Sequence, residues 1–366
     1  MLFHLILLIF IFQITGVSRA LSIEGLLLVI NAILISYFLI TNFKKLEIKK
    51  QELKLYILVL FFYISFLGLG FIHSNYNDFL KVLAICIYNL LALLFVLLTY
   101  KKKKIIIIRY LWYGSLFLSI TTIMIFFKNY DQLILQYSIP RAEGLIGNPN
   151  SLGITILILS LFIFLKKSIN FVDYIIIFVN LTAIILTVSR STILILLILL
   201  FILFLKIKLN IKYKIIIITI SSASLIILYN LIIKVNPNYF NRFMIDEDFD
   251  NGRIDALFAG LENFYSSIFG VGIGNTNKLI GQSAHNFFIE LLAQCGVFIL
   301  PFIFLIIYQL GYFVFVSSKK SNLFLLSSPL LIFIYSFFSH RLHYMLPVIL
   351  LFGVSVIESN TNNDNL

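Results

Sequence analysis

The chain has 366 residues and a formal net charge of +12 at pH 7, with 61% hydrophobic and only 12% charged residues. Soluble domains average about 45–50% apolar and about 25% charged residues, so this composition excludes an ordinary water-soluble fold. The basic residues stand in short clusters between apolar segments, a pattern that serves membrane topology and argues against nucleic-acid binding.

Apolar segments long enough to cross a bilayer recur along the whole chain. About 20 apolar residues span the ~30 Å hydrocarbon layer as a helix. Segments such as ILILSLFIFL (156–165) are apolar on every face, unlike the alternating strands of a barrel. We therefore predict an all-α transmembrane bundle that forms one integral membrane domain over residues 1–366. Its twelve predicted spans are residues 2–17, 22–42, 55–73, 79–99, 105–127, 149–165, 171–188, 191–207, 213–234, 285–316, 322–338 and 343–358.

Lysines predict the orientation of this bundle. Five lysine-rich segments fall on one side when two spans are counted between successive segments, and the positive-inside rule makes that side the cytoplasm, with both termini inside. These segments are residues 44–54, 101–104, 166–167, 206–214 and 319–320.

Arginines show the opposite distribution, since only Arg109 lies near the inner face. The planar guanidinium matches phosphate oxygens, so an exterior arginine cluster suits a phosphate-bearing lipid headgroup. Snorkelling anchors at helix ends are the alternative, which we favour for Arg19 and Arg242. The arginines predicted on the exterior side are Arg19, Arg141, Arg190, Arg242, Arg253 and Arg341.

One connection is long, residues 235–284, and it is predicted to be exterior. Loops of this length usually carry function. Apolar residues recur at near-helical spacing over 252–266, which predicts an amphipathic helix that could lie in the membrane interface.

Two motifs combine arginine with helix boundaries. In RAEGLIGNPN (141–150), Asn148 and Asn150 flank a proline at a predicted helix start, and a helix N-terminus beside Arg141 can receive an anion. A simple helix start is the alternative. In TVSRS (187–191), Arg190 lies in a short turn with little room to reach bulk water, and the alternative is a plain hairpin tip.

Three further motifs carry polar chemistry. Arg253 opens the predicted loop helix, where a surface salt bridge to a neighbouring aspartate is the alternative. His285 precedes Asn286 at the mouth of a span, and its pKa range suits a general base, although a lone histidine is more often structural. In SHRLHY (339–344), two histidines flank Arg341 without nearby carboxylates, so we predict no metal site.

In their order, these motifs resemble the O-antigen polymerase and ligase family of bacterial envelope glycosyltransferases. The resemblance covers about residues 141–300 and rests on four segments. It implies a metal-independent transferase without a cofactor, which acts on undecaprenyl-diphosphate-linked oligosaccharides at the outer face of the bacterial inner membrane. The segments are R-A-E-G-L-I-G-N-P-N (141–150), T-V-S-R-S (187–191), G-R with F-G-V-G-I-G (252–274) and A-H-N-F-F-I-E-L-L-A-Q-C-G (284–296).

The resemblance also implies roles for individual residues. Arg190 and Arg253 would hold the donor diphosphate, and His285 would lie beside the acceptor hydroxyl. The compact length favours a polymerase of lipopolysaccharide or related glycans over a ligase that transfers polymer to lipid A-core, and a secondary transporter or flippase is a remote alternative. Membrane lipid and a chain-length regulator are the other expected partners. The residues expected to bind substrate are Arg141, Asn148, Asn150, Gly272, Gly274, Asn286 and Arg341.

Overall fold

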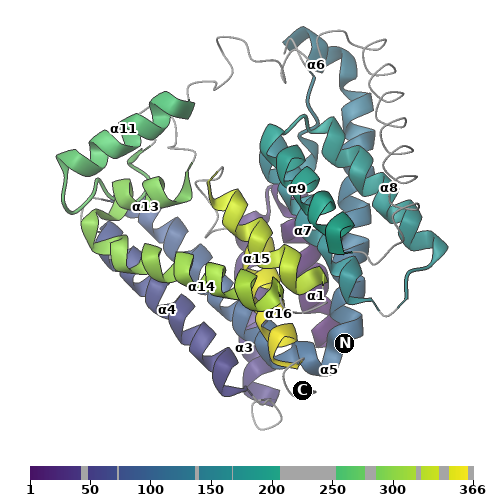
Figure 1. Cartoon of the computed structure of the whole chain (residues 1–366), viewed down its shortest axis with the longest axis horizontal. Coiled ribbons are helices and arrows are strands. Elements are labelled where there is room, and N and C mark those ends of the chain that lie inside the picture. Colours follow the sequence, from purple (N-terminus) through teal and green to yellow (C-terminus); the bar gives the residue numbers. More distant parts are fainter. Residues whose placement is uncertain are drawn as a thin grey trace.

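The described part of the chain is entirely helical outside its turns. The computed structural model describes residues 1–42, 48–71, 74–136, 140–166, 168–206, 253–276, 286–318, 323–337 and 346–361. Within these ranges there are fourteen α-helices, three short 3-10 helices and no strand (Figure 1). The predicted all-α class is confirmed.

Three helices are long and apolar enough to cross a membrane: α3 (Glu24–Asn42), α4 (Lys50–Phe71) and α5 (Tyr76–Lys128). The predicted number of twelve spans is not confirmed, because the other apolar helices are shorter and the predicted span 213–234 lies outside the described residues. These shorter helices are α1 (Leu2–Ile14), α7 (Pro149–Leu161) with η3 (Phe162–Leu165), α8 (Phe171–Leu186), α9 (Arg190–Lys206), α14 (Leu300–Ser318), α15 (Leu323–Ser336) and α16 (Leu346–Thr361). The remaining elements are α2 (Val17–Ala20), α6 (Tyr130–Gln136), η2 (Gly144–Ile146), α11 (Arg253–Ser266), α13 (Phe287–Cys295) and η5 (Val297–Ile299).

The predicted spans 79–99 and 105–127 belong to one helical element rather than to two helices joined by a loop. α5 contains 53 residues, and within it only Lys103 leaves helical geometry, with φ −125° and ψ 21°. In Figure 1 the resulting corner lies near the labels of both chain ends. The lysine run 101–104 therefore forms a kink inside a helix.

Two ion pairs fix this corner to other helices. Lys101 Nζ lies 2.5 Å from Glu52 Oε1 at the start of α4, and Lys104 Nζ lies 2.6 Å from Glu358 Oε1 near the end of α16. Tyr100 also donates a hydrogen bond to Glu358 Oε1 over 2.8 Å. Both carboxylates are buried. Charged side chains are almost never buried unless they are paired, so these lysines allow the corner to pack.

The predicted span 285–316 is wrong as one helix, because Gly296 divides it into α13 and α14. Gly296 has φ +69° and ψ −162°, and a Cβ there would lie 1.9 Å from the carbonyl oxygen of Ile268. That carbonyl accepts a hydrogen bond from the amide of Val297 over 3.0 Å. Only glycine permits this backbone contact at a positive φ.

Polar side chains join α5, α7 and α8 inside the bundle. Asn180 Nδ2 donates to Ser115 Oγ and to Ser160 Oγ, each over 2.9 Å. Ser119 Oγ donates to Asn180 Oδ1 over 2.8 Å. Asn180 is 1% exposed. Because a buried amide without partners is costly, these bonds specify how the three helices pack.

Candidate functional site

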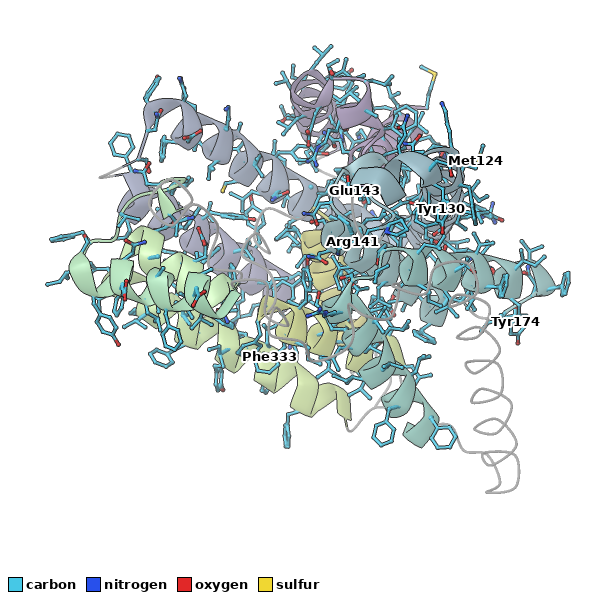
Figure 2. The ribbon with its side chains drawn as sticks, turned by 90° about the horizontal axis from the view of Figure 1, so that it is seen from above. Met124, Tyr130, Arg141, Glu143, Tyr174 and Phe333 are labelled. Atoms are coloured by element: carbon cyan, nitrogen blue, oxygen red, sulfur yellow. The ribbon has the colours of Figure 1, made fainter. Side chains whose placement is uncertain are left out.

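Arg141 fastens the segment before α7 to the end of α8. Its Nε donates to the carbonyl oxygen of Thr187 over 3.2 Å, and its Nη2 donates to Asn150 Oδ1 over 3.0 Å. The amide of Ala142 donates to the carbonyl of Leu186 over 2.9 Å. In the view from above, Arg141 and Glu143 lie toward the centre of the molecule (Figure 2). The first and second arginine motifs thus meet, although 46 residues separate Arg141 from Thr187.

Asn148 and Asn150 have different tasks at the start of α7. Asn148 is the N-cap, and its Oδ1 accepts a hydrogen bond from the amide of Ser151 over 3.0 Å. The predicted helix start is confirmed. Asn150 instead turns its side chain to Arg141. An N-cap satisfies one of the amides that an α-helix leaves unpaired at its beginning.

The turn between α8 and α9 is buried and rich in hydroxyl groups. Ser189 Oγ lies 3.0 Å from Thr192 Oγ1 and 3.3 Å from Ser191 Oγ. Val188 is fully buried and has φ +48°. A β-branched residue is rarely found in this region, and such strain costs about 1–3 kcal/mol and often occurs at functional sites. Nothing in the sequence motif TVSRS signalled the strained conformation.

A glycine lets α7 approach this turn closely. A Cβ on Gly153 would lie 2.9 Å from Thr192 Oγ1 and 3.1 Å from Thr187 Oγ1. Arg190 begins α9 and is half-buried, with its Nε atom inside the protein. We call Arg141, Asn150, Thr187, Ser189 and Arg190 the arginine corner, since the contacts of Arg141 and the turn bring them to one place.

The glycine-rich segment is fastened to the C-terminal end of α13. Gly270, Gly272 and Gly274 all have φ near +80°, at +79°, +88° and +80°. The amide of Val271 donates to the carbonyl of Ala293 over 2.8 Å, and that of Gly272 donates to the carbonyl of Gln294 over 3.0 Å. The left-handed conformations explain why glycines occur here.

Asn286 lies at the opposite end of α13 and is its N-cap, accepting from the amides of Phe288 and Ile289 over 3.0 and 3.2 Å. Nine helical residues rise about 13 Å, so the structure does not bring Asn286 next to Gly272 and Gly274.

Three of the predicted site groups fall on parts of the chain that are not described. They are His285, Arg341 and the side chain of Arg253, although the backbone of Arg253 begins α11 as expected. Glu290, in the first turn of α13, accepts a hydrogen bond from Gln294 Nε2 over 2.6 Å. Among the described residues, no three His, Cys, Asp or Glu side chains gather as a group that could hold a metal ion.

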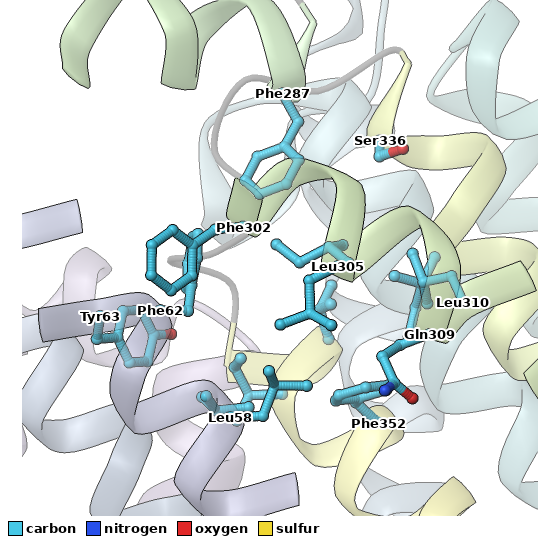
Figure 3. A pocket seen from close by; sticks show the side chains of 15 residues that line it. Leu58, Phe62, Tyr63, Phe287, Phe302, Leu305, Gln309, Leu310, Ser336 and Phe352 are labelled. Carbon is cyan, nitrogen blue, oxygen red and sulfur yellow. The ribbon is translucent and has the colours of Figure 1, made fainter. Parts of the chain in front are cut away.

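An apolar cavity lies directly below the start of α13. Figure 3 shows Phe287, the residue after Asn286, pointing toward this cavity between α4, α14, α15 and α16. Its volume is about 110 Å³, and Tyr63, Gln309 and Ser336 are the polar residues of its lining. Sequence motifs could not identify it, because its lining extends from residue 58 to residue 352. Such a lining suits hydrocarbon better than sugar.

No protein-family model matches this chain, and no curated protein or solved structure matches it. The resemblance to the O-antigen polymerase and ligase family therefore rests on the sequence motifs alone.

Proposed function

We propose that this protein is a bacterial inner-membrane glycosyltransferase of the O-antigen polymerase type. It joins oligosaccharide repeat units carried on undecaprenyl diphosphate, with its site at the outer face and both termini in the cytoplasm. The observation that carries the proposal is the arginine corner. There Arg141 donates hydrogen bonds to Thr187, in the buried turn that leads to Arg190, and to Asn150 at the N-terminus of α7.

The arginine corner suits the departure of a diphosphate. When the anomeric carbon–oxygen bond to the donor diphosphate breaks, the bonding electrons leave with the phosphate oxygen. Guanidinium groups that are already fixed in place can neutralise this charge by bidentate hydrogen bonds. The hydroxyl groups of the turn and the N-terminus of α7 add hydrogen-bond donors for an anion. This arrangement favours a donor with a diphosphate leaving group.

Two further roles are assigned to the unit formed by α11 and α13, which pack against each other. Arg253, which begins α11, joins Arg190 in holding the donor diphosphate, and His285, which directly precedes the N-cap Asn286 of α13, lies beside the acceptor hydroxyl. His285 takes the proton of the acceptor hydroxyl, whose oxygen attacks the anomeric carbon as the diphosphate leaves from the opposite face. The configuration at that carbon is inverted. The apolar cavity lies beside Phe287, at the start of α13.

A glycan profile of a deletion strain tests the proposal. Without the protein, glycan one repeat long should accumulate, and the wild type should restore a polymer ladder. Arg190→Ala and Arg190→Lys should both fail at normal membrane levels, because a point charge does not replace a bidentate fork. Arg109→Ala is the matched control, since Arg109 is an exposed arginine on α5 outside the arginine corner.

Other profiles point to other functions. Full-length polymer on undecaprenyl diphosphate, with bare lipid A, would identify a ligase. Lipid-linked units that stay on the cytoplasmic side would identify a transporter or flippase. If Arg141→Ala and Arg190→Lys both restore the full ladder, the arginine corner is not the site.

A further inference from the structure

A second groove lies between α1 and the half of α5 that follows the kink, at a place where the proposed glycan chemistry has no role. Its volume is about 300 Å³. Arg109, Tyr110 and Tyr113 line one part of it, and Ile11, Gly114 and Phe117 line another. The surface of the groove is almost wholly apolar, and the exposed Arg109 lies at one end of it, which we call the polar end.

The two helices run side by side in the same direction. His4 Nδ1 and Tyr110 Oη are 3.1 Å apart and form a hydrogen bond. Further along both helices, a Cβ on Gly114 would lie 2.7 Å from Ile11 Cδ1, so glycine allows the close approach. The polar end of the groove is thus at the end of α1 that begins the chain.

The exposed charge at the polar end is Arg109. The lysine run 101–104 precedes it on the same helix, but Lys101 and Lys104 pair with the buried Glu52 and Glu358. Neither α1 nor residues 105–128 contain an acidic residue that could neutralise Arg109 locally. The eight helical steps from Arg109 to Phe117 rise about 12 Å, most of the ~15 Å hydrocarbon depth of one leaflet.

We propose that this groove binds an anionic phospholipid of the leaflet at the lysine-rich end of the molecule. The phosphate pairs with the exposed Arg109 guanidinium at the polar end. One acyl chain lies over Ile11, Gly114 and Phe117. Basic pockets between membrane helices commonly bind acidic headgroups. The proposal rests on the membrane placement of the bundle and is independent of the glycan reaction.

Native mass spectrometry of the purified full chain tests this site. The protein in detergent is titrated with phosphatidylglycerol and, separately, with phosphatidylcholine. The wild type should bind one phosphatidylglycerol about tenfold more tightly than phosphatidylcholine, because hydrogen bonds to charged groups contribute roughly 1.5–3 kcal/mol. Arg109→Gln should remove this preference. Lys128→Gln is the control, since Lys128 is an exposed cation at the other end of α5.

A second pair of variants tests the acyl part of the groove. Leu8 and Leu5 are both 43% exposed on α1, but only Leu8 lines the groove. Leu8→Trp should fill it and weaken phosphatidylglycerol binding about tenfold, whereas Leu5→Trp should bind like the wild type. All four single variants change exposed residues, and size-exclusion chromatography checks their fold.

Three results would overturn the lipid site. The first is equal binding of the two lipids by the wild type, and the second is unchanged selectivity in Arg109→Gln. The third is unchanged binding in Leu8→Trp together with competition by inorganic phosphate, which would show a site for a phosphate group alone. None of these results bears on the glycan ladder, so failure here is distinguishable from failure of the polymerase proposal.

Discussion

Replacing Asn180 with alanine should lower the free energy of unfolding by about 2 kcal/mol. Asn180 is buried where α5, α7 and α8 meet, and its amide makes three hydrogen bonds of 2.8–2.9 Å to Ser115, Ser160 and Ser119. Hydrogen bonds between helices in a membrane protein contribute about 0.6 kcal/mol each on average, which gives roughly 2 kcal/mol for the three.

The loss stays moderate because two of the three serines, Ser115 and Ser160, keep other partners. Ser115 Oγ also donates to the carbonyl of Trp112 over 2.6 Å, and Ser160 Oγ donates to that of Ile156 over 2.8 Å. Removing the amide therefore leaves these hydroxyls satisfied within their own helices. A burial penalty of about 1–3 kcal/mol for each unpaired hydroxyl does not apply to them.

Equilibrium unfolding in mixed micelles measures the change, with Thr182→Ala as the matched control. Thr182 lies on the same helix, and its hydroxyl bonds only to the carbonyl of Phe178 among the contacts found. It should change stability by less than about 0.5 kcal/mol. A loss below about 0.5 kcal/mol for Asn180→Ala would refute the reasoning, as would strict additivity with Ser119→Ala, since coupled partners should not add.

Two more substitutions probe the backbone and the ion pairs. Gly296→Ala should lower the free energy of unfolding by more than about 3 kcal/mol, because its Cβ would overlap the Ile268 carbonyl. Gly311→Ala has open space around it and should raise the free energy of unfolding by about 0.5–1 kcal/mol. Thermal unfolding compares the two variants, and equal effects would contradict the strain argument. Lys104→Met should lower the free energy of unfolding by about 2 kcal/mol, because the buried Glu358 carboxylate loses its cation. In chemical unfolding, the double variant with Glu358→Gln should recover part of that loss. No recovery would count against the ion pair.

Local signals predicted the parts of the fold that depend on neighbouring residues. Asn148 and Asn286 begin helices as expected, because an N-cap is recognised from a few adjacent residues. The amphipathic helix expected over 252–266 is α11, Arg253–Ser266. An apolar helix is also found where the 149–165 span is predicted, as α7 continued by η3.

Features that depend on distant residues were missed. Lysine runs between apolar spans usually indicate loops. The run 101–104 instead forms a kink within a helix, where Lys104 pairs with Glu358 from the distant α16. The sequence predicted only that the motifs of Arg141 and Arg190 lie on the same side of the membrane. It did not predict the hydrogen bond from Arg141 to Thr187. Which faces of uniformly apolar helices pack together cannot be read from periodicity, since all their faces are apolar.

The ion pair at the corner of α5 also sets an order of assembly. Tyr100 and Glu358 are 258 residues apart, and a ribosome adds roughly 5–20 residues each second. Glu358 is therefore synthesised roughly 13–50 s after Tyr100. During that interval Lys104 lacks its carboxylate, whereas Glu52, the partner of Lys101, has already been made. A helix made late, α16, thus completes the contacts of a bend made near the beginning.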